Sequence, residues 1–129
     1  MLMLGTSPKY LFYYEHLLDS SDNLKLIQEF CVSNKSGYGL ERYIRELAES
    51  DEKDGSARTY LIKDKFTHEI VAYFSLKTGL FTIDAGNGYF YSISAVEISN
   101  FAVNSSYRKS IQMLRILVLQ FLQNLSYLL

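Results

Sequence analysis

The sequence has few of the side chains from which disulfides and metal centres are built. Its 129 residues include one cysteine, Cys31, and two histidines far apart, His16 and His68. A single cysteine excludes a disulfide within the chain, and isolated histidines form no metal cluster. Cys31 falls on the apolar face of a predicted helix, so we expect a buried small hydrophobic residue rather than a reactive thiol. The two histidines are expected to be structural or exposed.

A large excess of charge of one sign is also absent. The formal net charge is −1, so composition gives no independent support for nucleic-acid binding. The charges are nevertheless unevenly placed. Residues 46–54 hold five acids against one lysine, whereas Arg108, Lys109 and Arg115 follow Asn100 with no acid among them. This distribution predicts a local positive patch after residue 100.

The remaining composition is that of one globular domain over residues 1–129. Apolar residues make up 48% of the chain, enough for a substantial core. No charged leader with a cleavage site is present, so the expected location is the cytoplasm. Residues 1–8 are expected to be a frayed leader.

The first half of the chain predicts one strand and two helices. Residues 9–18 are dense in aromatics, which favours a strand. The cluster Ser20-Ser21-Asp22 caps a predicted helix that carries Leu24, Ile27, Phe30 and Cys31 at helical spacing. Residues 40–48 form the clearest amphipathic helix, whose charged face we interpret as solvated. Its apolar positions are Leu40, Tyr43, Ile44, Leu47 and Ala48.

The second half predicts a sheet. Residues 59–63 and 70–80 are strand-like and flank a polar turn, which indicates a hairpin. Gly79 suggests a bulge or a close backbone approach. Residues 84–88 are predicted to be a flexible crossing, with residues 89–94 as an ordered loop before a strand at 95–103. Because sequence neighbours tend to pair, strand 70–80 should lie between the other two, antiparallel to both.

The stretch from Ala95 to Ser110 has the pattern of a central strand running into a helix. Apolar residues on both of its faces are typical of a sheet covered on both sides. Ser105 or Ser106 can cap the following helix, and the free N–H groups behind such a cap can bind an anion. The stretch therefore predicts a site for a phosphorylated cofactor, although most strand-to-helix corners bind nothing.

Two segments resemble the GNAT superfamily of N-acetyltransferases, in particular its toxin-type branch. Gly55-Ser56-Ala57-Arg58-Thr59 is similar to a "G-x-x-R-T" strand entry, and Val71-Ala72-Tyr73-Phe74-Ser75-Leu76 to a "V-x-Y-[FY]-x-L" strand. Residues 97–108 resemble the family's fourth strand and the start of its acetyl-CoA loop. The resemblance covers roughly residues 9–110. It implies an α/β (α+β) fold with a mixed, mostly antiparallel sheet flanked by helices, lacking the C-terminal part of the family's fold.

The resemblance also implies where acetyl-CoA would lie. Backbone groups of Phe101, Ala102 and Val103 match those that bind the pantetheine arm, and Arg108, Lys109 and Ser110 match the start of the pyrophosphate loop. The sequence departs here from the family pattern [QR]-x-x-G-x-[GA], since Ile111 and Met113 stand where glycine or another small residue is expected. A Cβ at these positions obstructs backbone approach to a phosphate.

Glu97 occupies the position where some members of the superfamily carry a glutamate that accepts the amine proton. An alkylammonium cannot attack a thioester, so a base is needed, and burial raises the pKa of a carboxyl towards that task. An equally weighted interpretation is a strand glutamate paired with a neighbouring Lys or Arg. Tyr60, Tyr73 and Tyr107 are better explained as core and edge aromatics.

Residues 111–129 are apolar on nearly every side of a predicted helix. Such a helix must be buried, so we expect a homodimer formed through it. Polar interruptions make a membrane span unexpected. The ending departs so abruptly from the family pattern that a shifted frame or a truncated gene is an open alternative.

Two functions of different class follow. One is an N-acetyltransferase, complete or damaged, that transfers acetyl from acetyl-CoA to an amine acceptor. The other is a catalytically inactive GNAT-like domain that acts as a dimerising or binding module. The acceptor cannot be read from the residues. The toxin branch suggests aminoacyl-tRNA, which the near-neutral charge does not support on its own.

Overall fold

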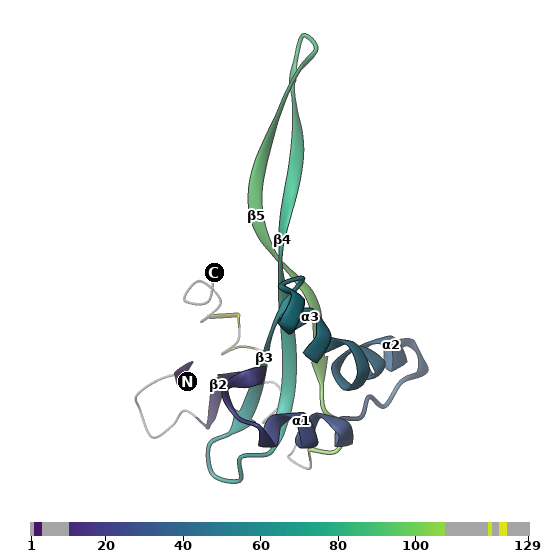
Figure 1. The fold of residues 1–129 in the computed structure, drawn as a ribbon, viewed down its shortest axis with the longest axis vertical. Coiled ribbons are helices and arrows are strands. Elements are labelled where there is room, and N and C mark those ends of the chain that lie inside the picture. The colour runs from purple at the N-terminus through teal and green to yellow at the C-terminus, as the bar shows by residue number, and fades with distance from the viewer. Residues whose placement is uncertain (1, 4–10, 108–118, 120–121, 124–129) are drawn as a thin grey trace.

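The computed structural model describes residues 2–3, 11–107, 119 and 122–123. Its strands form one antiparallel sheet in the order β1-β2-β3-β4-β5, and helices lie beside it (Figure 1). The strands are β1 (Leu2–Met3), β2 (Phe12–His16), β3 (Arg58–Asp64), β4 (Ile70–Gly86) and β5 (Tyr89–Val103). Among the described residues no helix is long and apolar enough to cross a membrane.

The order of the strands confirms the predicted centre of the sheet. β4 pairs with β3 from Leu76 to Ile70 and with β5 along nearly its whole length, antiparallel to both. Several boundaries differ from the sequence expectation. The strand expected over residues 9–18 ends at His16, because Leu17–Asp19 form a 3₁₀ turn, and residues 84–86, expected in a flexible crossing, belong to β4. Leu2 and Met3 pair with β2, so the expected frayed leader begins in the sheet. Residues 89–94, expected to form a loop, belong to β5 because β4 and β5 continue as one long hairpin.

The two strands of that hairpin are joined by a tight turn. Gly86 pairs with Tyr89, which leaves a two-residue loop of Asn87 and Gly88. Both have positive φ, 54° and 78°, as a type I′ turn requires. Asn-Gly is the favoured sequence for such a turn because both residues tolerate left-handed conformations.

The helical layer is built from short pieces between β2 and β3. α1 (Asp22–Leu26) is extended by a 3₁₀ turn at Ile27–Glu29. After a further 3₁₀ turn at Lys35–Gly37, α2 (Tyr38–Arg42) continues through a π-turn at Tyr43–Leu47 into α3 (Ala48–Asp54). Gly55, at φ 82°, ends α3 in the left-handed conformation typical of a helix end.

Two sequence expectations about these helices were wrong. Leu47, expected on the buried face, is 44% exposed. The wider π-turn changes the angular step between residues, so regular helical spacing no longer predicts which side of the helix Leu47 faces. Cys31 is only half-buried, because the backbone is already extended at Phe30 and Cys31 lies beyond the helix.

The core has one cluster on each face of the sheet. The helical face is centred on Tyr73, which is fully buried and donates from its hydroxyl to the carbonyl of Leu40 over 2.6 Å. The other face is centred on Phe74, on which Tyr60 stacks at 5.3 Å between ring centroids. Tyr107 is also buried, so the interpretation of these tyrosines as core and edge aromatics is confirmed.

A buried ionic network joins α1 to the sheet. The ammonium of Lys63 donates to Asn23 Oδ1 over 2.6 Å and to Glu15 Oε1 over 3.1 Å. Asn23 donates in turn to Glu15 over 2.7 Å and to the carbonyl of Leu17 over 3.1 Å. Desolvation acts to raise the pKa of Glu15, but the hydrogen bonds from Asn23 and Lys63 and the Lys63 charge together hold that pKa below its usual value.

The turn after β5 is fixed by Asn104. Its side-chain amide donates to the carbonyl of Ile70 over 2.8 Å, and its Oδ1 accepts from the N–H groups of Cys31 and Ser106 at 3.1 and 3.2 Å. Its backbone N–H donates to Val71. One side chain therefore joins the end of β5 to the start of β4 and to the segment after α1.

We predict that Glu15 makes the stability of the fold depend on pH below about 4.5. A carboxyl whose pKa is lowered by folding stabilises the native state above its unfolded pKa, and this contribution is lost as pH falls through the folded pKa. Glu15→Gln should therefore flatten the decline in unfolding free energy below pH 4.5, measured by urea denaturation. Glu46→Gln, at an exposed site, serves as the control. An equally steep decline in Glu15→Gln would contradict the assignment.

We predict that Asn104→Ala costs about 2 kcal/mol of unfolding free energy, because it leaves a carbonyl and two N–H groups without their partner. Asn34→Ala, at an exposed site, should stay within about 0.5 kcal/mol. Asn104→Asp keeps the acceptor oxygens but loses the donor to Ile70, so it should fall between the two. Equal stability of all three variants would show that the turn does not depend on this side chain.

Candidate functional site

The outer edge of β5 is the candidate cofactor surface. β5 is the last strand in the sheet order, so among the described residues no strand pairs with its outer edge. The residues expected to bind pantetheine lie at the C-terminal end of β5. They are Phe101, Ala102 and Val103, which pair with Phe74, Tyr73 and Ala72 on β4. Ala102 is 5% exposed and points into the core, whereas Phe101 and Val103 are half-buried. Their backbone is thus held in place by packing at the end of a strand whose outer edge no described strand pairs with.

A β-bulge interrupts β5 directly before these residues. Ser75 pairs with Asn100 but Leu76 pairs with Ile98, so Ser99 is an extra residue on β5. The hydroxyl of Ser99 donates to the carbonyl of Ser75 over 3.3 Å. An unpaired residue on an edge strand leaves backbone groups that can bind a ligand, and bulges are frequent beside active sites. Sequence reasoning placed the irregularity at Gly79 instead.

Gly79 lies in the regular part of the ladder opposite Ala95. A Cβ built there would lie 3.3 Å from the ring of Phe81, so the close approach that the glycine allows is to an aromatic side chain.

The bulge decides which way Glu97 faces. Because side chains alternate along a strand, the extra residue puts Glu97 on the same side of the sheet as Asn100 and Ala102, the side of the helices. Glu97 is exposed and lies opposite Lys77 on β4. The structure therefore brings an acid and a lysine to the base of the β4–β5 hairpin.

The turn that follows β5 leads directly to the predicted phosphate-binding residues. Ser105 and Ser106, expected to cap a helix, donate from their hydroxyls to the carbonyls of Cys31 and Glu29 at 3.1 and 3.4 Å. They therefore hold the turn against the segment after α1. Arg108, Lys109 and Ser110 lie outside the described residues.

Tyr107 ends the described part of this turn. Its hydroxyl donates to Asp64 Oδ2 over 2.6 Å in a buried site. Burial, followed by the hydrogen bond to Asp64 and that carboxylate's charge, raises the pKa of Tyr107 above its usual value. Tyr107, which immediately precedes Arg108 in the sequence, is therefore an uncharged side chain that holds the turn against β3.

A pocket that sequence reasoning missed lies at the base of the hairpin. It has a volume of about 340 Å³ and is lined from four elements: the end of α3, the start of β3, and the parts of β4 and β5 that lie just beyond the pairing with β3. It contains Lys77 and Val96, which are the cross-strand partner and the neighbour of Glu97. Residues distant in sequence meet here, so no local pattern could have indicated it.

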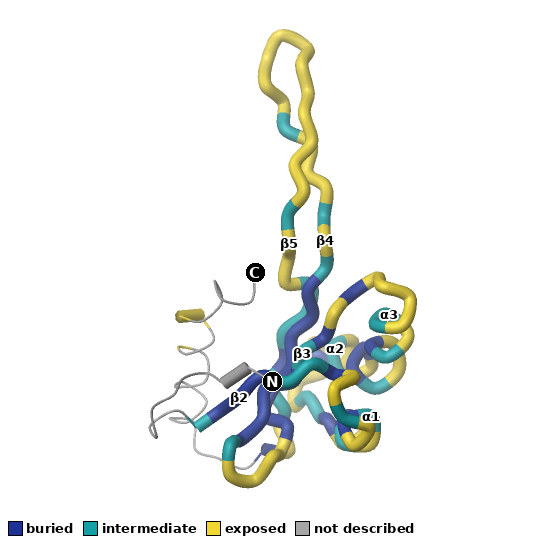
Figure 2. The backbone as a smooth tube through the Cα atoms, turned by 60° about the vertical axis from the view of Figure 1, so that its left-hand side comes forward, coloured by how far each residue is buried: buried dark blue, intermediate teal, exposed yellow. Residues whose placement is uncertain are grey.

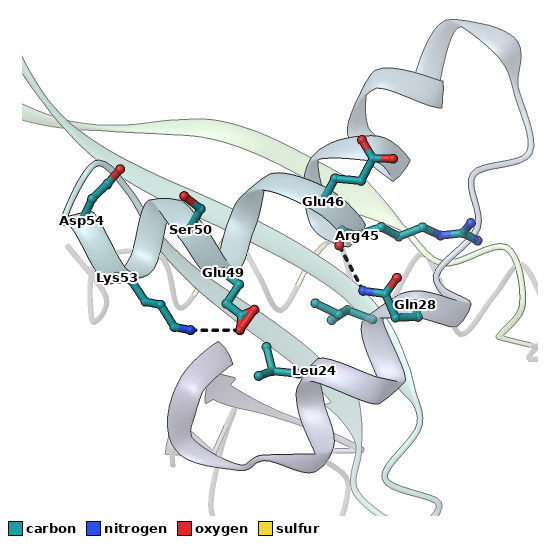
Figure 3. A pocket seen from close by; sticks show the side chains of 9 residues that line it. Leu24, Gln28, Arg45, Glu46, Glu49, Ser50, Lys53 and Asp54 are labelled. Carbon is teal, nitrogen blue, oxygen red and sulfur yellow. Dashed lines mark hydrogen bonds and ion pairs between the residues drawn. The ribbon is translucent and has the colours of Figure 1, made fainter.

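A second groove, of about 430 Å³, lies between α1 and the α2–α3 helix (Figure 3). Gln28 donates to the carbonyl of Arg45 across it over 3.0 Å, and Lys53 pairs with Glu49 over 3.2 Å. No residue of β5 lines it, so it is separate from the candidate cofactor surface. Among the described residues no group of three potential ligands could hold a metal ion.

Comparisons with known proteins identify the fold. No protein-family model and no curated protein matches the chain. Solved structures of bacterial toxins do. AtaT in complex with acetyl-methionyl-tRNA aligns with a TM-score of 0.56 at 15% identity, covering 90% of this chain and 72% of AtaT.

Two further matches agree. AtaTR bound with acetyl-CoA aligns with a TM-score of 0.58 at 15% identity, over 90% of this chain and 72% of the other. A KacT mutant aligns with a TM-score of 0.56 at 12% identity, over 88% and 71%. At these identities the likeness establishes the fold alone. The fold expected from the sequence resemblance is confirmed: this chain has a GNAT-like fold, which it shares with these toxin structures.

Proposed function

We propose that this chain binds acetyl-CoA along the outer edge of β5 and transfers the acetyl group to an amine. The observation that carries the proposal is the outer edge of β5, with which no described strand pairs, together with the bulge at Ser99 and the turn that Asn104 fixes shortly before Arg108 in the sequence. Acetyl-CoA present in a structure of the same fold supports the choice of cofactor.

In this proposal the backbone near Phe101–Val103 binds pantetheine, and Arg108, Lys109 and Ser110 bind the pyrophosphate. Strand edges bind extended ligands through N–H and C=O groups that no other strand uses. Two cations next to a phosphate add charge-assisted hydrogen bonds, each stronger than a neutral one. Ile111 and Met113 replace the small residues of the family pattern, so we expect weak affinity.

The acceptor is proposed to enter through the pocket at the base of the hairpin. Glu97 lies next to that pocket and accepts the amine proton as nitrogen attacks the thioester carbon and the CoA thiolate departs. The pocket also contains Arg58 and Lys77, which suit an acceptor that carries an anionic group near its amine. AtaT is complexed with acetyl-methionyl-tRNA, an acetylated and strongly anionic molecule, which supports an aminoacyl-tRNA as the acceptor.

A second candidate is a binding module without catalysis. The sequence observation that favours it is the pair Ile111 and Met113 in the expected phosphate loop. The two candidates separate experimentally, because the module binds its partner without releasing CoA.

We predict that acetyl-CoA raises the melting temperature of the chain, because a ligand that binds only the native state stabilises it. Arg108→Glu with Lys109→Glu should weaken binding by about 2 kcal/mol, or roughly thirtyfold, measured by calorimetry. The double reversal Arg42→Glu with Lys53→Glu changes the net charge equally at exposed positions and serves as the control. Equal loss in both variants would indicate a general charge effect rather than this site.

We predict that Glu97→Gln lowers the rate of acetyl transfer about 10²–10⁴-fold while leaving acetyl-CoA affinity unchanged, as expected for loss of a general base. The measurement is CoA release with primary amines and aminoacyl-tRNA as acceptors. Glu46→Gln, exposed on the helix, serves as the control. An unchanged rate in Glu97→Gln would favour the alternative role, in which Glu97 only pairs with a neighbouring cation.

A further inference from the structure

The pocket at the base of the β4–β5 hairpin contains a buried acid that the proposed transfer step does not use. The pocket lies where β4 and β5 pass from the buried body into the exposed end of the hairpin (Figure 2). Glu52 on α3 lines it, although the Glu52 side chain is only 5% exposed. Acids are rarely buried to this extent unless they are paired, so the contacts of Glu52 decide what it can bind.

The pocket is lined entirely by described residues. The helix predicted over residues 111–129, and the homodimer predicted through it, fall outside the described residues except at 119 and 122–123.

One oxygen of Glu52 carries its hydrogen bonds. Oε1 lies 2.6 Å from Nε2 of His16 and also accepts from the backbone N–H of Thr59. Within the described part of the chain Oε2 accepts no hydrogen bond, and it is not sealed from solvent. A carboxylate has about four acceptor sites. Oε2 therefore keeps the capacity to accept from a donor that enters the pocket.

His16 supports two walls of the pocket. Its Nε2 contacts Glu52, and its ring meets the ring of Tyr60 edge-on, with 5.5 Å between the ring centroids. Tyr60 lines the pocket as well, and it is held from another side by stacking on Phe74. His16 is not among the described residues that line the pocket. It is a positioning residue, which holds the acid and the aromatic ring in place.

The pocket also contains cations that are not paired with this acid. Arg58 and Lys77 line it, and neither forms an ion pair with a described residue. Opposite charges that share a pocket without pairing leave space for a ligand between them. A volume of about 340 Å³ is within the range of small-molecule sites. A ligand with an ammonium group and an anionic group would bind both kinds of charge.

The groups around Glu52 favour an alkylammonium at that end of the pocket. A carboxylate forms charge-assisted hydrogen bonds with an ammonium, and an aromatic ring attracts a cation near its face. An anionic group would be repelled by Glu52. A metal ion is not favoured either, because no group of three potential ligands occurs among the described residues.

We propose that Glu52 binds the amine of the acceptor in its ammonium form, and that Arg58 and Lys77 bind an anionic group of the same molecule. This assignment rests on the proposed function, in which the acceptor enters through this pocket. The substrate class is then a primary amine that also carries an anionic group, a class that includes aminoacyl-tRNA. The proton of the bound ammonium passes to Glu97, so Glu52 orients the amine without exchanging a proton.

The test compares the binding of O-phosphoethanolamine and ethyl phosphate to the full chain without acetyl-CoA, by ¹H–¹⁵N NMR titration. The two probes share the phosphate, and only O-phosphoethanolamine has an ammonium group. We expect the wild type to bind O-phosphoethanolamine more tightly, with shifts at the amides of Gly55 and Lys77 in the pocket. Glu52→Gln should weaken O-phosphoethanolamine about tenfold, as expected for one charge-assisted hydrogen bond, without weakening ethyl phosphate.

Two further variants complete this test. Glu46→Gln removes the same charge at an exposed site and should bind both probes like the wild type. His16→Phe keeps a ring beside Tyr60 but loses the contact with Glu52, so it should weaken O-phosphoethanolamine alone, by less than Glu52→Gln does. A wild type with no preference for O-phosphoethanolamine would overturn the assignment, whether or not the variants fold. Equal weakening of both probes in a folded Glu52→Gln chain would also overturn it.

Acetyl transfer is measured separately, so that this assignment and the proposed function can fail independently. With O-phosphoethanolamine as acceptor, Glu52→Gln should raise KM about tenfold with little change in kcat, whereas loss of the base Glu97 lowers kcat. Binding that depends on Glu52 without any release of CoA would support the ammonium site and count against acetyl transfer. Release of CoA with the same KM in wild type and Glu52→Gln would support transfer and overturn the role of Glu52.

Discussion

Strand β4 pairs with β3 on one side and with β5 on the other between Ala72 and Leu76, and side chains of this part of β4 form the centre of both core clusters. Tyr73 reaches one face and bonds to the helical layer, and Phe74 fills the other. Since both faces are anchored on the same short stretch, the position of β5, and with it the candidate cofactor edge, is fixed by how this stretch packs. A loss of packing here would misplace the site without touching any of its residues.

Most of the fold could be predicted because its signals are local and periodic. The helix over 40–48, the hairpin of residues 59–80 and the central position of strand 70–80 depend on side-chain alternation and turn chemistry that the sequence displays. The distal part of the β4–β5 hairpin was not predicted. Residues Tyr89–Ser94 lie beyond the core, so burial does not impose on them the alternation of apolar and polar side chains that is typical of a strand with one buried face. The Asn87-Gly88 pair was the available signal, since it favours a two-residue hairpin turn.

Less of the candidate site could be predicted. The positions of Glu97 and Phe101–Val103 follow from family resemblance, but Ser99 carries no mark of a bulge, because a bulge depends on how two strands register rather than on one residue. The π-turn and the half-exposure of Cys31 have the same origin in tertiary packing. The pocket at the base of the hairpin joins three segments distant in the sequence. None of these could be inferred from spacing along one segment.

The long hairpin also has a consequence for the order in which the protein folds. Its two-residue turn brings β4 and β5 together with minimal loop entropy, and isolated hairpins form within microseconds. Pairing of β2 with β3, by contrast, must close a segment of about forty residues that contains the helices. If closure proceeds from the turn at Asn87 towards the body, the alignment of Phe74 with Phe101 is set before the core exists. The exposed end of the hairpin would then serve as the template that brings the core strands into register.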